Sequence, residues 1–322
     1  MKALTRNRSA GLALADLALL ATVAAAFPSF IHPAELAATF DDTAILIILA
    51  FGQMAVLLTR GVDLSIAAIV ALSGMVAAQA DSAGLGMAAV LGIALATGTA
   101  LGAINGWLVW QCKVPPIVTT LGTMAFYRGL VFLISDGVWV TNRSMSPAFL
   151  GLVRETALGL TLPSWLAIVA IAAAILLFGA TRLGRSFYAA GSNPEAALYV
   201  GIGVGRTQFA AFTLSGLLGG LCGYLWVAKF AIAYTDIATG FELQVIAACV
   251  IGGASIAGGS GTVVGVTLGA LFLGIIKNAL PLVGISPFWQ MAISGIVIVI
   301  AVVINSRAER APRRRILAEA SA

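Results

Sequence analysis

Long apolar stretches alternate with short polar ones along almost the whole chain. A bilayer-spanning helix needs about 20 apolar residues. By that measure the pattern predicts ten transmembrane helices, at residues 11–30, 43–59, 64–80, 85–110, 117–134, 163–179, 207–230, 242–257, 261–281 and 287–304. The stretch 242–257 is short and interrupted by glycines, which leaves open a full crossing or a half-helix, and residues 28–42 predict an external loop. The expected fold is an all-α, polytopic membrane helix bundle.

Composition supports an integral membrane protein. The 322 residues are 60% hydrophobic and 10% charged, with a mean hydropathy of +1.04, which leaves too little polar surface for a water-soluble globule. The three cysteines have no paired spacing and His32 is the single histidine, so neither a disulfide framework nor a metal site is expected. The net charge of +5 predicts no nucleic-acid partner here, because its distribution along the chain matters more than its sum.

The basic residues indicate which side of the membrane each loop faces. With a cytoplasmic N-terminus, thirteen of the 18 lysines and arginines fall on the inner side, namely Lys2, Arg6, Arg8, Arg60, Lys113, Arg182, Arg185, Arg206, Arg307, Arg310, Arg313, Arg314 and Arg315. Most acidic residues fall on the other side, with Lys229, Arg143 and Arg154 beside them. An even number of spans with both termini in the cytoplasm fits this asymmetry.

This topology divides the chain into three parts. We expect a cytoplasmic tail at residues 1–10, a transmembrane domain at 11–304 and a basic cytoplasmic tail at 305–322. A cleaved signal peptide is the alternative for the first apolar run, but Asp16 interrupts that run and no small-residue cleavage site ends it.

A polar, basic interruption at residues 181–206 separates the two hydrophobic halves. The sequence Gly191-Ser192-Asn193-Pro194 predicts a turn. Pro194 and Glu195 suit the first turn of a short helix that reaches Tyr199 and stops at Gly201. The small alanines on this helix would let another protein approach closely. The segment is therefore a candidate docking loop, with candidate residues Arg185, Gly191, Asn193, Glu195, Ala196, Ala197 and Gly201.

Two further segments depart from plain membrane-spanning helix. The first, Gly61-Val62-Asp63-Leu64-Ser65, is either a tight cytoplasmic turn in which Asp63 or Ser65 caps the next helix, or part of a gate or pathway wall. The second, residues 251–261, is rich in glycine and is either a surface turn or a packed element that moves. Their comparable places in the two halves hint at an internal repeat. The gate or hinge candidates are Gly61, Asp63, Ser65, Gly252, Gly253, Gly258, Gly259 and Gly261.

Glycines also recur inside the predicted spans at helix-packing spacing, at 98, 102 and 106, at 216, 219, 220 and 223, and at 265, 269 and 274. This spacing predicts helices that approach closely and form a compact bundle. Planar hydrogen-bonding groups and aromatic faces hold polyols, so the pathway candidates are Phe126, Asn278, Trp289 and Gln290.

Three separated motifs, in order, carry a resemblance to a known family. They are residues 61–65, the loop 184–202 with Glu195-Ala196-Ala197 and Gly201, and residues 251–261. Together they resemble the permease subunits of bacterial ABC importers for monosaccharides, a group that includes the ribose, xylose, rhamnose and autoinducer-2 permeases. The resemblance runs from about residue 43 to residue 304.

The resemblance implies an ABC importer permease fold of about ten helices in the bacterial inner membrane. It implies pairing with a second permease copy or a paralogue, with cytoplasmic ATPase subunits and with a periplasmic sugar-binding protein. The loop around Glu195 and Gly201 is similar to the family's coupling helix, which sits in a groove of the ATPase. Pro194, which would stiffen the turn, departs from the family's pattern.

The expected function is translocation of a monosaccharide or related small polyol, driven by ATP. The chain has no Gly-x-x-x-x-Gly-Lys-Ser/Thr motif, so ATP would be bound by the partner ATPase and no cofactor is expected in this chain. A secondary transporter or channel is the alternative, but few ionisable residues other than Asp16 and Lys277 lie where ion coupling needs them. A membrane-embedded enzyme would need a nucleophile and base or a metal constellation, for which a single histidine is insufficient.

Overall fold

The computed structural model describes residues 8–285, 289, 292, 295 and 296. Its helices are α1 (Arg8–Ala26), α2 (Pro33–Leu58), α3 (Ile66–Ser82), α4 (Met87–Trp110), α5 (Pro116–Ser135), α6 (Pro147–Arg154), α7 (Leu162–Ala180), α8 (Arg182–Ser192), α9 (Pro194–Tyr199), α10 (Val204–Phe230), α11 (Phe241–Ile251) and α12 (Val263–Ala279). Two 3-10 helices, η1 (Pro28–Ile31) and η2 (Leu280–Val283), complete the helical elements of this part of the chain. Residues 1–7, most of the predicted span 287–304 and the predicted tail 305–322 lie outside the described residues.

Seven of the described helices are long and apolar enough to cross a membrane, and α3 and α11 are shorter apolar helices. Together they match the first nine predicted spans. The 11 residues of α11 make a helix roughly 16 Å long at about 1.5 Å per residue, against a hydrocarbon core of about 30 Å. This length favours the half-helix alternative for 242–257.

The predicted external loop at 28–42 is wrong in its second half, because α2 begins at Pro33. Pro33 and Glu35 both lie in the first turn of α2, where proline and acidic residues favour a helix start. These signals outweigh the polarity of Asp41 and Asp42, whose carboxylates are instead paired with Lys229 of α10 at 2.7 and 2.9 Å.

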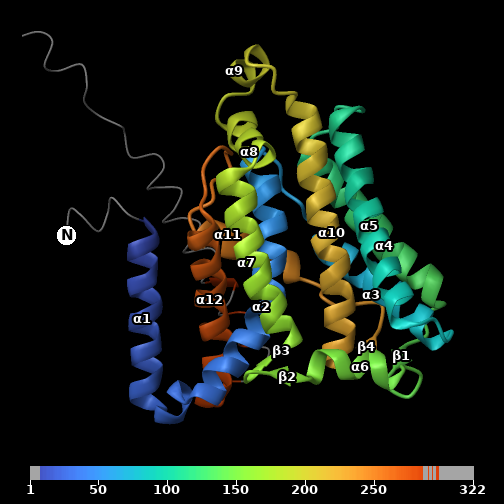
Figure 1. Ribbon diagram of the computed structural model, residues 1–322, viewed down its shortest axis with the longest axis vertical. Coiled ribbons are helices and arrows are strands. Elements are labelled where there is room, and N and C mark those ends of the chain that lie inside the picture. Colours follow the sequence, from blue (N-terminus) through green and yellow to red (C-terminus); the bar gives the residue numbers. More distant parts are fainter. Residues whose placement is uncertain (1–7, 286–288, 290–291, 293–294, 297–322) are drawn as a thin grey trace, which may run out of the picture.

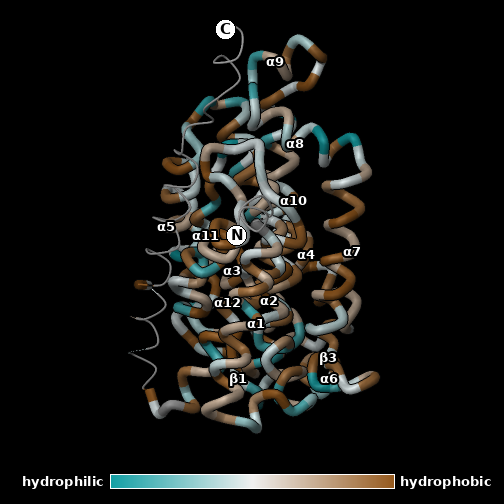
Figure 2. The backbone as a smooth tube through the Cα atoms, turned by 90° about the vertical axis from the view of Figure 1, so that its left-hand side faces the viewer, coloured by the Kyte–Doolittle hydropathy of each residue, from teal (hydrophilic) through white to brown (hydrophobic). Residues whose placement is uncertain are grey.

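The helices form a bundle in which α10 packs against α2, α3 and α4 (Figure 1). The whole of α2 from Thr43 to Leu58 is buried, as expected for a central helix that is apolar on all sides. At the edge of the bundle α1 packs along α12. Hydrophilic positions gather around α8 and α9 at one end and around β1 and α6 at the other (Figure 2); we call these the α8–α9 end and the α6 end.

Four two-residue strands stabilise the α6 end. The pair β1 (Val140–Thr141) and β4 (Ile232–Ala233) is antiparallel, as is the hairpin of β2 (Thr156–Ala157) and β3 (Leu160–Thr161). The β1–β4 pair joins loops that are distant in sequence, and neither pair changes the all-α class of the fold.

Close helix packing at the predicted glycines is confirmed. A Cβ atom on Gly98 of α4 would lie 2.5 Å from Cα of Gly220, and one on Gly102 would lie 2.8 Å from Cα of Gly216. Such distances leave no room for a side chain, so α4 and α10 touch backbone to backbone, as small residues allow in membrane proteins.

Candidate functional site

The predicted docking loop folds into two short helices, α8 and α9. Thr181 caps α8 by accepting a hydrogen bond from N–H of Gly184 at 3.0 Å, and Asn193 caps α9 by accepting one from N–H of Ala196 at 3.1 Å. Asn193 precedes proline and is extended, with φ of −151°. This conformation ends α8 and separates it from α9. The predicted helix from Pro194 to Tyr199 is confirmed, whereas the predicted turn is narrower, because Gly191 and Ser192 belong to α8.

The tip of α9 stands clear of the bundle (Figure 1), and its apolar side chains are exposed. Leu198 is 61% exposed, Tyr199 92% and Val200 74%, whereas Ala197 is buried. Glu195 and Ala196 are also exposed, and Gly201 has a φ of +81° that favours glycine. Sequence reasoning selected the small and polar positions of this helix but not Leu198, Tyr199 and Val200, whose apolar run next to Gly201 was the available signal.

Two of the sequence motifs, residues 184–202 and 251–261, meet at the last two residues of α8, beside Leu58 and Arg60, which precede the third motif. The Arg60 guanidinium donates from Nε to the carbonyl of Gly191 at 2.6 Å and from Nη2 to the carbonyl of Ser192 at 3.1 Å. The amide of Gly259 donates to the carbonyl of Leu58 at 3.0 Å, and Ser192 Oγ donates to the carbonyl of Gly259 at 3.2 Å. We call these five residues the α8 junction.

Glycines make the α8 junction possible. A Cβ atom on Gly191 would lie 2.6 Å from the amide nitrogen of Gly259 and closer still to the carbonyl oxygen of Leu58. Gly258 and Gly259 have φ of +88° and +71°, values that side chains other than glycine rarely adopt. The glycine-rich segment 251–261 is therefore packed, whereas its movement or contact with a partner stays a prediction. Arg60, which packs against it, was not among the candidate residues.

Tyr188 adds a further bond between α8 and the glycine-rich segment. Its hydroxyl donates to the carbonyl of Gly261 at 3.0 Å, and burial raises the pKa of Tyr188. Arg185, another predicted docking residue, is exposed and bonds the carbonyl of Ala180 at 3.0 Å.

The segment Gly61–Ser65 runs from Arg60 into the interior of the bundle. Asp63 is fully buried and accepts hydrogen bonds from Ser65 Oγ at 2.7 Å and from Ser215 Oγ of α10 at 2.8 Å. The tight turn predicted here is confined to Thr59 and Arg60. Of the two predicted caps, Ser65 makes no side-chain cap bond to α3, whereas Asp63 Oδ1 accepts a hydrogen bond from N–H of Ser65, at the start of α3, at 3.0 Å.

Hydrogen bonds connect Asp63 with side chains on four helices, α2, α4, α5 and α10. Asn105 Nδ2 of α4 donates to Ser65 Oγ at 2.8 Å, and the Tyr127 hydroxyl of α5 donates to Asn105 Oδ1 at 3.2 Å. The Gln53 amide of α2, with its nitrogen turned towards the carbonyl of Asp63, bonds the Asp63 backbone at 3.1 and 3.2 Å. We call the set the buried polar cluster: Gln53, Asp63, Ser65, Asn105, Tyr127 and Ser215. Its members are mutually satisfied, so the cluster joins helices and is closed to solute.

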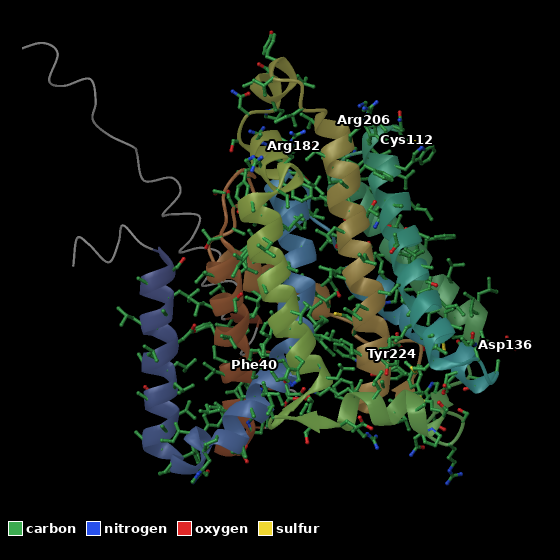
Figure 3. The ribbon with its side chains drawn as sticks, viewed as in Figure 1. Phe40, Cys112, Asp136, Arg182, Arg206 and Tyr224 are labelled. Carbon is green, nitrogen blue, oxygen red and sulfur yellow. The ribbon has the colours of Figure 1, made fainter. Side chains whose placement is uncertain are left out.

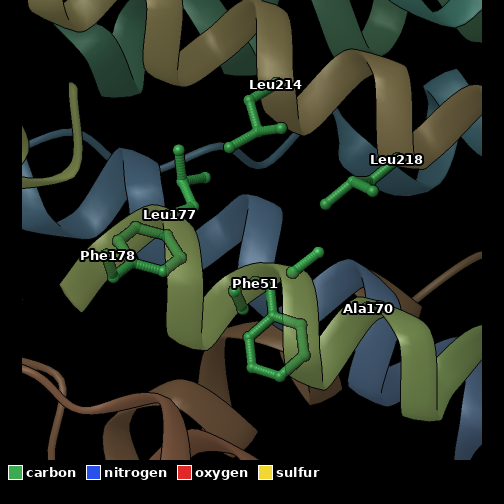
Figure 4. Close-up of a pocket in the computed structure, with 8 residues that line it drawn as sticks. Phe51, Ala170, Leu177, Phe178, Leu214 and Leu218 are labelled. Atoms are coloured by element: carbon green, nitrogen blue, oxygen red, sulfur yellow. The ribbon is translucent and has the colours of Figure 1, made fainter. Parts of the chain in front are cut away.

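A groove of about 300 Å³ opens between α7, α2 and α10 (Figure 4). It is lined by Phe51, Ala170, Ala173, Ala174, Leu177, Phe178, Leu214 and Leu218. None of these side chains carries a hydrogen-bonding group, so the groove is unsuited to a polyol.

The pathway candidates do not form one site. Phe126 is 62% exposed on α5 and Trp289 is 67% exposed, while Asn278 bonds the carbonyl of Gly274 in its own helix, α12, at 3.0 Å. Figure 1 places α5 and α12 on opposite sides of the bundle. Gln290 lies outside the described residues, and the role of each candidate stays a prediction.

Charged residues differ between the two ends of the bundle. Arg182 and Arg206 lie at the α8–α9 end, where Cys112 is also found, and Asp136 lies at the α6 end (Figure 3). Cys112 is exposed, whereas Cys222 and Cys249 are buried. Among the described residues no three His, Cys, Asp or Glu side chains gather as metal ligands.

Comparison with known proteins identifies the family. Residues 36–302 match the family model described as branched-chain amino acid transport system / permease component. The chain is similar to the autoinducer 2 import system permease protein LsrC of Enterobacter sp. (strain 638), with 35% identity over 98% of this chain and 91% of the relative. It is also similar to the ribose import permease protein RbsC of Escherichia coli (strain K12), with 36% identity over 91% of this chain and 92% of the relative. No solved structure matches the chain.

The family model covers most of the transmembrane bundle, and the relatives align over nearly their whole length. The matched region includes the α8 junction, the buried polar cluster and α9. The chain therefore belongs to the permease-component family of branched-chain amino acid transport systems, and it is a multi-pass membrane subunit of an ABC importer, not an enzyme.

Proposed function

We propose that this chain is the permease subunit of an ATP-driven importer for a monosaccharide or a related small polyol. A separate cytoplasmic ATPase supplies the energy, a periplasmic binding protein delivers the solute, and a second permease copy or a paralogue completes the transmembrane part. The names of the relatives, which include ribose and autoinducer 2 import permeases, support this class of solute.

The observation that carries the proposal is the exposed tip of α9. Leu198, Tyr199 and Val200 form an apolar surface on a helix that stands clear of the bundle. Exposed apolar patches rimmed by polar residues mark protein interaction sites, and a small helix with apolar anchors fits a groove on a partner. We assign this surface to the ATPase, which the chain needs because it has no nucleotide-binding motif of its own.

We further propose that the α8–α9 end faces the cytoplasm. Arg182 and Arg206 lie at this end (Figure 3), Arg60 bonds the foot of α8, and Lys113 follows the exposed Cys112. Basic loops face the cytoplasm in membrane proteins, so the charge distribution supports this orientation. With the even number of spans that the sequence predicts, this orientation leaves both termini in the cytoplasm, in a bacterial inner membrane.

Little solute recognition is expected inside a single copy of the chain. The groove in Figure 4 is apolar and the buried polar cluster is closed. We assign selectivity to the soluble binding protein, and we propose the glycines at 252, 253, 258, 259 and 261 as hinge or gate positions beside the docking loop.

Charge substitution at the tip tests the proposal. Leu198→Glu should remove an apolar anchor, so that the ATPase no longer co-purifies with the permease and ATP-dependent sugar uptake into proteoliposomes is lost. The matched control is Leu158→Glu, since Leu158 is a 92% exposed leucine in the hairpin turn at the α6 end. That variant should retain the ATPase.

Two outcomes would contradict the proposal. If Leu198→Glu keeps the ATPase and normal uptake, the tip of α9 is not the docking surface. If the purified chain accumulates solute without any ATPase, the protein is a secondary transporter or channel.

A further inference from the structure

Arg60 connects the docking loop to the interior of the bundle. Its side chain bonds the last two residues of α8 at 2.6 and 3.1 Å. Its backbone has a φ of +65° and leads directly into residues 61–65, which include Asp63. The same residue therefore contacts α8 and lies in the chain segment that connects α2 to α3.

The contact at the α8 junction is stiff. A guanidinium presents its donors in a planar fork, and charge-assisted hydrogen bonds are stronger than neutral ones. Backbone atoms of Leu58, Gly191 and Gly259 touch without room for a Cβ atom. Packed elements of this kind move as rigid bodies and do not deform continuously, so a displacement of α8 must also displace Arg60.

The inner end of the segment is held equally firmly. Asp63 bonds Ser65 and Ser215, and Asn105 and Tyr127 follow in the same cluster. Thr120 of α5 also donates to the carbonyl of Val62 at 3.0 Å. A displacement of Arg60 would therefore act on α3, α4, α5 and α10 through these hydrogen bonds.

We propose that Arg60 is a positioning residue that transmits movement of α8 and α9 to the segment Gly61–Ser65, and through it to the buried polar cluster. The inference rests on the proposed function, because it takes the ATPase as the source of the movement. It adds the residue and the contacts through which that movement reaches the transmembrane helices.

The test uses the complete transporter, with the permease, its ATPase and its binding protein. In Arg60→Ala the ATPase should remain bound and basal ATP hydrolysis should continue, while uptake per ATP hydrolysed falls about tenfold, within the range of coupling between distant sites. Arg60→Lys keeps the charge but not the fork, so an intermediate loss is expected. Arg143→Ala, at an exposed arginine near β1, is the control and should behave as the unchanged chain.

A second readout separates transmission from transport. Hydrogen–deuterium exchange is measured with and without the ATPase bound to a non-hydrolysable nucleotide. In the unchanged chain the ATPase should protect the α9 amides and also alter exchange at residues 61–65. In Arg60→Ala the protection at α9 should persist and the change at 61–65 should disappear.

The outcomes are distinguishable. A response at 61–65 that survives in Arg60→Ala, or that is absent from the unchanged chain while α9 is protected, overturns the role of Arg60. A loss of uptake and ATP hydrolysis in equal proportion in Arg60→Ala shows a merely structural role and also overturns it. A normal exchange response without sugar uptake refutes the proposed solute class and leaves the transmission intact, whereas no protection at α9 refutes docking and the inference with it.

Discussion

Adding a single methyl group at Gly98 tests how closely α4 and α10 must pack. In Gly98→Ala the new Cβ atom would lie 2.5 Å from Cα of Gly220, where ordinary contact begins at 3.4 Å. The two helices must therefore separate by roughly 0.9 Å at their crossing, a strain of the kind that overpacking causes. The crossing also holds Asn105 and Ser215 in position, since both helices contribute to the buried polar cluster.

The expected loss follows from two opposing effects. Overpacking costs about 3 kcal/mol at the upper end of its usual range, and replacing a helical glycine by alanine returns about 1 kcal/mol. The net destabilisation is about 2 kcal/mol. Gly92→Ala is the matched control on the same helix, because nothing lies within 4 Å of a Cβ atom at Gly92, and it should gain up to about 1 kcal/mol.

Thermal unfolding of the two purified variants measures the difference. At about 2 °C per kcal/mol for a chain of this size, the Tm of Gly98→Ala should fall about 6 °C below that of Gly92→Ala. Both scans use one detergent and one heating rate, because unfolding of large membrane proteins is often irreversible. A Gly98→Ala protein that melts at or above Gly92→Ala would refute the backbone contact between α4 and α10.

Three further changes have defined outcomes. Asp63→Asn replaces one accepting oxygen by a donor and leaves Ser65 or Ser215 without its acceptor, so unfolding in detergent should be easier by about 1–3 kcal/mol, with Ser215→Ala as the milder comparison. Lys229→Met removes the cation between Asp41 and Asp42. Because Lys229 and Asp41 are only 18% exposed, the variant leaves a mostly buried carboxylate without its cation, so the free energy of unfolding should fall by about 1–3 kcal/mol, measured by Tm at low and high salt. Burial raises the pKa of Tyr188 above its ordinary value of about 10. The contribution of the neutral phenol to stability is therefore complete below about pH 10 and is lost as the pH rises above that value. The Tm of Tyr188→Phe should depend less on pH between about pH 9 and 11.

The sequence predicted helices better than contacts. Runs of apolar residues located the first nine spans, and proline and glycine placed α9 correctly, because these signals are local. The predicted start of α2 is wrong because two adjacent carboxylates, Asp41 and Asp42, are typical of a loop, whereas in the structure both pair with Lys229, which is far along the chain. A local sequence pattern does not reveal such a distant partner.

The same limit applies to the functional site. The three motifs were recognised separately, but nothing in their spacing shows that residues 58–60, 191–192 and 258–259 share one junction. In the sequence Arg60 is one of several basic residues in the predicted inner loops. Its role depends on its hydrogen bonds to the carbonyls of Gly191 and Ser192, which the sequence does not show. The sequence identifies the glycines, but it does not show which backbone segment packs against each of them.

The distribution of thiols gives the unaltered protein its own orientation marker. Cys112 is exposed at the turn between α4 and α5, while Cys222 and Cys249 are enclosed by helices. A maleimide that cannot cross membranes should therefore react at a single position, without any cysteine having to be introduced. Intact cells should leave that position unlabelled and inverted vesicles should label it, which reports the sidedness of the α8–α9 end in the native chain.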